Sequence, residues 1–74
     1  MMLALPRAAS VRMEVLDVMG RVVRKLPSPR LAAGEYRLTW DGRARDGHSV
    51  SSGAYWVVVW VDDRRLVRPV VALK

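Results

Sequence analysis

Cysteine is absent from this 74-residue chain, so no disulfide can stabilise its fold. Chains of this length bury only about 60% of the surface that their unfolded state exposes, and their stability is marginal. The core must therefore come from tightly packed Val, Leu, Trp and Tyr side chains, or be shared with a neighbouring domain. The absence of cysteine excludes a disulfide-dense secreted mini-protein, but it leaves the cellular compartment open.

Long apolar runs are also missing. No stretch approaches the roughly 20 apolar residues that a membrane-spanning helix needs. The first ten residues, MMLALPRAAS, superficially resemble a signal peptide, but they lack a basic start, and Pro6 and Arg7 interrupt the apolar stretch. We therefore expect neither a transmembrane segment nor a signal peptide here, and an export signal would have to lie elsewhere.

The residues that usually carry catalysis are scarce. His48 is the only histidine, and the candidate nucleophiles beside it are Ser49, Ser51 and Ser52. Neighbours within one loop rarely form a catalytic triad, because the members of a triad converge from separate elements. The chain also has no Gly-rich phosphate loop and no zinc ligand set. We expect no catalytic residue, no cofactor, no small-molecule substrate and a protein that is not an enzyme.

A calcium site in the same loop is a weak alternative. Asp41 and Asp46 offer carboxylate oxygens, but calcium takes about six to eight oxygen ligands. Arg43 and Arg45 lie between the two aspartates and would repel a cation. Turn capping is the better interpretation of both carboxylates, so we expect no metal site.

Basic residues outnumber acidic ones, 13 to 7, and the formal net charge is +6. Clustered cations bind nucleic acid through phosphate contacts. Lysine, however, occurs only at Lys25 and Lys74, and this excess of arginine favours a compositional bias over a dedicated patch. A small basic β-barrel that binds nucleic acid is therefore the least favoured functional hypothesis, behind the two that are given at the end of this section.

Alternating apolar side chains indicate β-strands. Val11, Met13 and Val15 share one face of the segment 11–17, and Gly20 fits a turn into a second strand over residues 21–26. A helix over residues 11–26 competes, because apolar residues also recur there at spacings of three and four. Gly20 in mid-helix and the valines of residues 15–23 favour the hairpin.

Further strands are expected along the rest of the chain. Residues 35–40 alternate, with Tyr36, Leu38 and Trp40 inward, and the apolar residues 54–61 predict a strand covered on both faces. Residues 65–73 form a last strand in which Pro69 implies an edge position or a bulge. Residues 2–5 form a first strand, and Pro27 to Pro29 end the second strand of the hairpin.

The aromatic residues are expected to build the core. Tyr36 and Trp40 share one apolar face, and Trp56 and Trp60 share one face of the apolar strand. Tyr55 lies on the opposite face from these two tryptophans, so it is expected to be the freest aromatic side chain.

Strands at intervals of roughly 8 to 12 residues are typical of a β-sandwich or barrel. The fold class is therefore all-β, and we expect a single domain over residues 1–74. The predicted structural turn residues are Gly20, Gly34, Trp40, Asp41, Gly42, Asp46 and Gly47.

Several spaced motifs together carry a family resemblance. They are Asp-x-x-Gly-Arg-x-Val from Asp17 to Val23, Ala33-Gly34, Trp40-Asp41-Gly42, Asp46-Gly47 and Ser52-Gly53-x-Tyr55. The chain resembles the FlgD/Vpr immunoglobulin-like domain and the overlapping type A C-terminal sorting domain of the type IX secretion system. The resemblance implies a small immunoglobulin-like antiparallel β-sandwich of about six to seven short strands. Family members usually begin with a longer first strand, so we expect the first strand here to be truncated.

The resemblance also implies a function. The leading hypothesis is a sorting and anchoring module of an exported bacterial protein, located outside the cell or on its surface and recognised by the secretion machinery. The second is an immunoglobulin-like spacer or assembly scaffold, as in the hook-capping protein, with neighbouring domains as partners. A terminal strand with an unpaired edge suits recognition by strand addition. The expected sorting or partner edge consists of Gly53, Tyr55, Arg68, Val70, Val71, Leu73 and Lys74.

Overall fold

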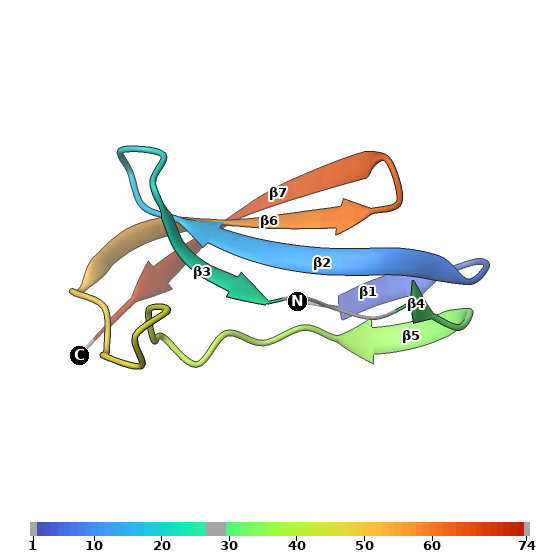
Figure 1. The fold of residues 1–74 in the computed structure, drawn as a ribbon, viewed down its shortest axis with the longest axis horizontal. Helices are drawn as coiled ribbons and strands as arrows, with labels where there is room; N and C mark the ends of the chain where they lie inside the picture. Colours follow the sequence, from blue (N-terminus) through green and yellow to red (C-terminus); the bar gives the residue numbers. More distant parts are fainter. Residues whose placement is uncertain (1, 27–29, 74) are drawn as a thin grey trace.

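Seven antiparallel strands make up the fold in the computed structural model, which describes residues 2–26 and 30–73. The strands are β1 (Met2–Leu5), β2 (Ala9–Leu16), β3 (Val22–Leu26), β4 (Arg30–Leu31), β5 (Gly34–Arg37), β6 (Gly53–Val61) and β7 (Arg64–Ala72). Figure 1 shows two layers, with β1 and β5 lying beneath a larger sheet. The all-β, immunoglobulin-like sandwich expected from the sequence is confirmed.

The larger sheet has five strands. Its order is β3-β2-β6-β7, and β4 pairs with the start of β2. The smaller sheet consists of β1 and β5, paired from Met2 with Arg37 to Leu5 with Gly34. No helix in the described ranges is long and apolar enough to cross a membrane. Below, the inner face of the larger sheet is the one that packs on β1 and β5, and the outer face is the one that points away from them.

The core lies between the two layers. Every second residue of β2 points inward and is buried, which is the pattern predicted for this strand. β6 pairs with β2 so that Met13 is opposite Val59 and Val15 is opposite Val57. Val15 and Val59 are fully buried, and Leu3 of β1 closes the core from the other layer.

A tight turn joins β2 to β3 and confirms the hairpin rather than the competing helix. The Asp17 carboxylate accepts hydrogen bonds from the backbone N–H of Arg21 (3.0 Å) and of Met19 (2.9 Å), and from Arg21 Nε (2.9 Å). The Gly20 N–H donates to the Asp17 carbonyl (3.0 Å), and Gly20 has a φ of 81°, which favours glycine. The Arg21 backbone bond, supported by the other two, holds the pKa of Asp17 below its ordinary value.

The strand that includes Tyr36 is shorter than the sequence predicts, and one short strand was not predicted. The strand expected over residues 35–40 ends at Arg37, because its partner β1 has only four residues and Arg37 already pairs with Met2. Leu38 and Trp40 still pack against the core, as predicted for that face. β4 was not predicted, since two residues are too short for a periodic signal. The expected stop at Pro27 to Pro29 lies outside the described residues.

The expected roles of the aromatic residues on β6 were wrong. Tyr55 is buried in the core, with 8% of its surface exposed, whereas Trp56 is 44% exposed on the outer face. Trp60 lies on that outer face as well, because β6 alternates and Val57 and Val59 are the residues that meet the inner face of β2. Val57, Val59 and Tyr55 face the space between the layers, and Trp56 and Trp60 stay outside it.

Shortening a fully buried side chain is expected to destabilise the domain. Val59→Ala removes two methyl groups from the centre of the core, and we expect the free energy of unfolding to fall by about 2 kcal/mol. Val18→Ala, at a side chain that is 70% exposed, should change it by less than about 0.5 kcal/mol. Urea unfolding of the two variants measures the difference, and equal losses would contradict the described core.

Acid is expected to weaken the β2–β3 turn. The pKa of Asp17 is lowered in the folded state, so its stabilising effect is complete above the ordinary value of 3.8 and is lost as the pH falls through the folded value. Asp17→Asn should therefore lower stability at neutral pH and lose less stability on acidification below about pH 4. Denaturant unfolding across this range tests it, with Asp63→Asn in the β6–β7 turn as the control. An unchanged acid dependence in Asp17→Asn would contradict the assignment.

Candidate functional site

β7 forms an open edge of the larger sheet. It pairs with β6 without a register shift, from Gly53 with Ala72 to Val61 with Arg64. No strand within the described residues pairs with its other side. Pro69 lies in the middle of β7, opposite Trp56, and proline is tolerated on an edge strand because it has no N–H to donate. The edge position is therefore the correct one of the two predicted for Pro69.

The opposite edge of the sheet, β3, is obstructed. The Arg45 N–H from the loop of residues 38–50 donates to the Val23 carbonyl of β3 (3.0 Å). Arg24 Nη1 reaches back to the Asp41 carboxylate (3.4 Å) and to the carbonyls of Arg43 (3.2 Å) and Ala44 (3.4 Å). The Arg45 bond occupies the Val23 carbonyl of the strand, and the Arg24 bonds hold the loop beside β3, where another strand would have to pair. β7 is consequently the better candidate for strand addition.

Most of the predicted partner-edge residues lie on β7 or at its ends. Val71 and Leu73 are 64% and 85% exposed, and Arg68 is exposed, with its Nη1 donating to the Val67 carbonyl (2.9 Å). Gly53 begins β6 opposite Ala72 and is exposed. Val70 is half-buried against the core. Lys74 lies outside the described residues.

Tyr55 does not belong to that edge, because β6 lies between β2 and β7. Its hydroxyl donates to the Ser51 carbonyl (2.7 Å), and its ring packs edge-on against Trp40, with the centroids 5.3 Å apart. Tyr55 thus ties the loop of residues 38–50 to the core. The structure gives it a packing role rather than a surface for a partner.

A hollow lies between this loop and the inner side of β7. Its volume is about 330 Å³, and its lining includes Met13, Leu38, Trp40, Val57 and Val70. A second hollow of about 290 Å³ follows between residues 40–42 and the end of β7. The core is therefore incompletely covered on the β7 side. A neighbouring domain or partner that met this side would bury more apolar surface.

The predicted turn residues around Asp41 form hydrogen-bonded turns. Trp40 Nε1 donates to the Arg43 carbonyl (3.0 Å), and the Asp41 carboxylate accepts from the Arg43 N–H (3.0 Å). The Val50 N–H donates to the Gly42 carbonyl (2.9 Å), and Gly42 has a φ of 75°. Asp41 thus caps a turn, as expected from the sequence.

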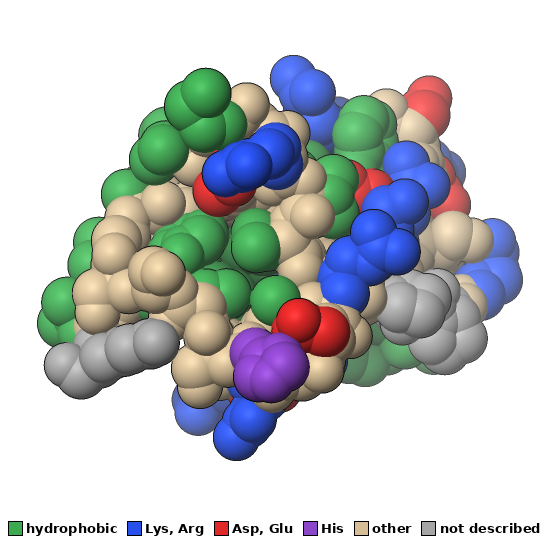
Figure 2. All heavy atoms as spheres, turned by 60° about the vertical axis from the view of Figure 1, so that its left-hand side comes forward, with side chains coloured by type: hydrophobic (Ala, Val, Ile, Leu, Met, Phe, Trp, Pro, Cys, Tyr) green, Lys and Arg blue, Asp and Glu red, His purple; other side chains and the backbone are tan. Residues whose placement is uncertain are grey.

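Asp46 does the same one turn later. Its Oδ1 accepts from the His48 N–H (3.0 Å), and its Oδ2 lies 3.0 Å from His48 Nδ1. The backbone bond from His48, together with the imidazole contact, lowers the pKa of Asp46. Figure 2 shows the histidine on the surface of this end of the molecule, beside an acidic side chain. Within the described residues, no group of three or more His, Cys, Asp and Glu side chains could hold a metal ion.

A cationic row on the outer face was missed from the sequence. Arg12 of β2, Trp60 of β6 and Arg65 of β7 are cross-strand neighbours. The guanidinium carbons of Arg12 and Arg65 lie 5.0 and 5.7 Å from the centroid of the Trp60 ring, close enough for cation–π attraction. Alternation along β2 already places Arg12 outside, but only the register between strands brings it to Trp60.

A family model and the similar curated proteins both relate this chain to FlgD. The FlgD Ig-like domain family matches residues 1–64, which include β1 to β6 and the first residue of β7. The chain is 40% identical over 52 residues, 70% of its length, to the basal-body rod modification proteins FlgD of Salmonella typhimurium strain LT2 and Salmonella typhi. It spans only 22% of the length of these relatives. The family match covers most of the sandwich described above, so this chain belongs to the FlgD Ig-like domain family.

Proposed function

We propose that this domain is a non-catalytic assembly module, which supplies a rigid sandwich and a protein-binding surface to a larger bacterial protein. The observation that carries the proposal is the FlgD Ig-like match over residues 1–64. The similar FlgD proteins are named basal-body rod modification proteins, and this name supports an assembly role. The proposed setting is an exported protein outside the cell or on its surface.

The polar residues of the loops support a structural role. Asp17, Asp41 and Asp46 each direct a carboxylate oxygen to backbone N–H groups of their own turns. His48 lies on the surface beside Asp46, and the side chains of Tyr55 and Trp40 are engaged in packing and turn bonds. The carboxylates and the polar groups of the aromatic side chains thus form hydrogen bonds that hold the loops in place.

The unpaired edge of β7 supports protein partners. A strand from a neighbouring domain or partner subunit could pair with its free backbone groups, and side-chain contacts beside the strand would give specificity. The hollows beside Val70 would be covered in the same event. Neighbouring domains or partner proteins are therefore the proposed contacts, and neither a small-molecule substrate nor a cofactor is proposed.

Sorting by the type IX secretion machinery is the competing hypothesis. It draws on the same β7 edge, including Arg68, Val70, Val71 and Leu73. The FlgD Ig-like match ends at residue 64, before these residues, and the similar curated proteins are FlgD proteins. The assembly role is therefore preferred.

A reporter fusion separates the two hypotheses. Residues 1–74 are fused behind a reporter that reaches the periplasm, in a cell with a working type IX system. The assembly role predicts that the reporter stays in the periplasm, because this role requires no sorting signal in the domain. Release of the reporter to the cell surface or medium would contradict the proposal.

A deletion provides the control for that fusion. Removing residues 70–74 takes away the half-buried Val70 and Ala72 and shortens β7. The assembly role predicts lower thermal stability and no change in the location of the reporter. If the full-length fusion is released and the deletion is retained in folded form, the end of β7 acts as a sorting signal and the assembly role is wrong.

A further inference from the structure

The outer face of β6 and β7 carries an uncovered apolar patch. We define the outer patch as Trp56, Val67, Pro69 and Val71. They share one face, because Trp56 is opposite Pro69 and the alternate residues of β7 point the same way. Trp56, Val67 and Val71 are 44%, 39% and 64% exposed, and Pro69 is also exposed. Contiguous apolar surface of this kind marks an interaction site more often than scattered exposed side chains do.

One end of the outer patch is bounded by the β2–β3 turn. Leu16 pairs with Trp56, and the turn that follows Leu16 carries Val18 and Met19, which are 70% and 75% exposed. Figure 1 shows this turn rising on the side of the larger sheet that faces away from β1 and β5. The apolar surface thus continues along the strands to the turn.

The other end of the outer patch is bounded by the row of Arg12, Trp60 and Arg65. Within the described residues neither arginine forms an ion pair, whereas Arg21 and Arg24 each pair with an aspartate. Glu14 of β2 is acidic and has Lys25 and Val58 as cross-strand neighbours. Asp62 lines a hollow with Arg12 and Trp60, and its carboxylate accepts from the Ser10 N–H (3.0 Å). The face therefore has excess positive charge beside its apolar patch, and it complements a partner that combines apolar side chains with carboxylates.

A protein partner fits this surface better than nucleic acid does. Bases bind to sheets by stacking on free aromatic rings. The Trp60 ring is already contacted by two guanidinium groups, which leaves Trp56 as the exposed aromatic side chain of the patch. The other members are aliphatic, and aliphatic side chains of a partner would pack on them.

The dimensions of the face indicate the shape of that partner. The patch spans two neighbouring strands, about 5 Å apart, which one helix of roughly 10 Å diameter covers. From Val71 to Arg65 the strand rises about 20 Å, which corresponds to a helix of about 13 residues. Helices commonly cover an open sheet face in two-layer folds.

We propose that the outer patch and the row of Arg12, Trp60 and Arg65 bind an acidic amphipathic helix of a partner protein. The apolar stripe of the helix would pack on Trp56, Val67, Pro69 and Val71. Its carboxylates would pair with Arg12 and Arg65. This inference rests on the assembly role proposed above, and it names the surface and the chemistry of the partner.

The test uses the full 74-residue chain and a fluorescent model peptide. The peptide is an amphipathic helix with leucines on one face and glutamates elsewhere, and a matched peptide carries lysines in place of the glutamates. Fluorescence anisotropy should show saturable binding of the glutamate peptide and at least about tenfold weaker binding of the lysine peptide. Failure of the glutamate peptide to bind, or equal binding of the two peptides, would overturn the proposal.

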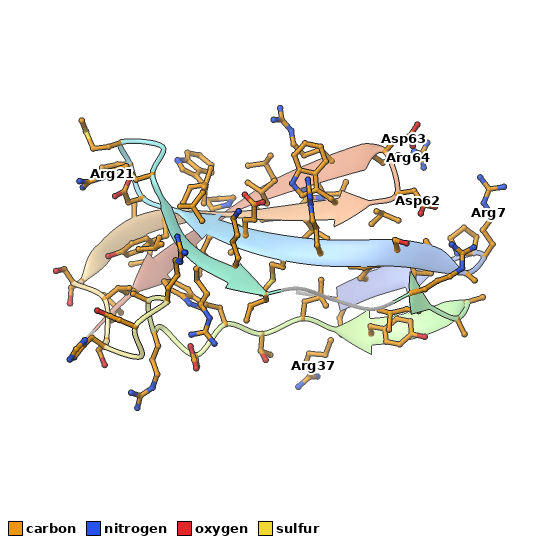
Figure 3. The ribbon with its side chains drawn as sticks, viewed as in Figure 1. Arg7, Arg21, Arg37, Asp62, Asp63 and Arg64 are labelled. Carbon is orange, nitrogen blue, oxygen red and sulfur yellow. The ribbon has the colours of Figure 1, made fainter. Side chains whose placement is uncertain are left out.

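Paired variants locate the binding surface. Arg12→Glu with Arg65→Glu should weaken binding of the glutamate peptide about tenfold or more. Arg7→Glu with Arg37→Glu gives the same change in net charge and should leave binding unchanged. In Figure 3, Arg37 points away from the larger sheet on the far side of β5. Equal losses in both pairs would show that binding follows net charge alone, and would overturn the proposal.

The apolar contacts are tested in the same way. Trp56→Ser should weaken binding of the glutamate peptide about tenfold, and Met2→Ser, which removes an exposed side chain from β1 in the other layer, should not. Circular dichroism checks the fold of each variant. If Trp56→Ser does not fold, Val71→Ser at a more exposed position decides instead. Unchanged binding in a folded outer-patch variant would overturn the proposal.

Two other ligands of this face, nucleic acid and a second copy of the chain, would each give a different experimental result. Displacement of the glutamate peptide by a single-stranded oligonucleotide would assign the face to nucleic acid. A dimer in sedimentation that Trp56→Ser dissolves would assign it to a second copy of the chain. Either result overturns the helix proposal. The reporter fusion remains the separate test of the assembly role, because a released reporter contradicts that role whatever the peptide does.

Discussion

The pairing register between β2 and β6 is the constraint on which the rest of the structure depends. Side chains alternate across a strand, so one register decides at once which residues fill the core and which face solvent. The observed register places Met13 opposite Val59 and Arg12 opposite Trp60. A slip of β6 by one residue against β2 would turn Trp56 and Trp60 toward the core and move Val57 and Val59 to the outer face. Core and candidate binding face are thus two outcomes of the same pairing.

The small second layer gives the domain its asymmetry. Two short strands cover part of the inner face, and the β7 side keeps its hollows, an unpaired edge and half-buried side chains such as Val70. The β3 edge, in contrast, is held by the loop of residues 38–50 through Arg24 and Arg45. A chain of this size has little core to spare, so contact with another protein surface on the β7 side would add burial that the isolated domain lacks.

The periodicity of apolar residues was sufficient to predict most of the strands, but it could not predict which face of every strand is buried. The alternation of Val11, Met13 and Val15 predicted β2 and its buried side, and Gly20 predicted the hairpin turn. β6 is apolar on both faces, so its pattern contains no signal for which face is inner. The prediction assumed that the large aromatic side chains build the core, and it wrongly placed Trp56 and Trp60 inside and Tyr55 outside. The Arg12–Trp60–Arg65 row depends on pairing between distant segments, which alternation within one strand does not reveal.

The orientation of β6 is measured most directly by side-chain nuclear Overhauser effects in solution. The described register predicts contacts from the Trp60 ring to the side chains of Arg12 and Arg65, and from the Tyr55 ring to Trp40. Contacts from the Trp60 ring to the core methyl groups of Val15 and Leu3, with Tyr55 lacking contacts to Trp40, would show that β6 has the opposite orientation. That result would contradict both the core and the binding face derived from it.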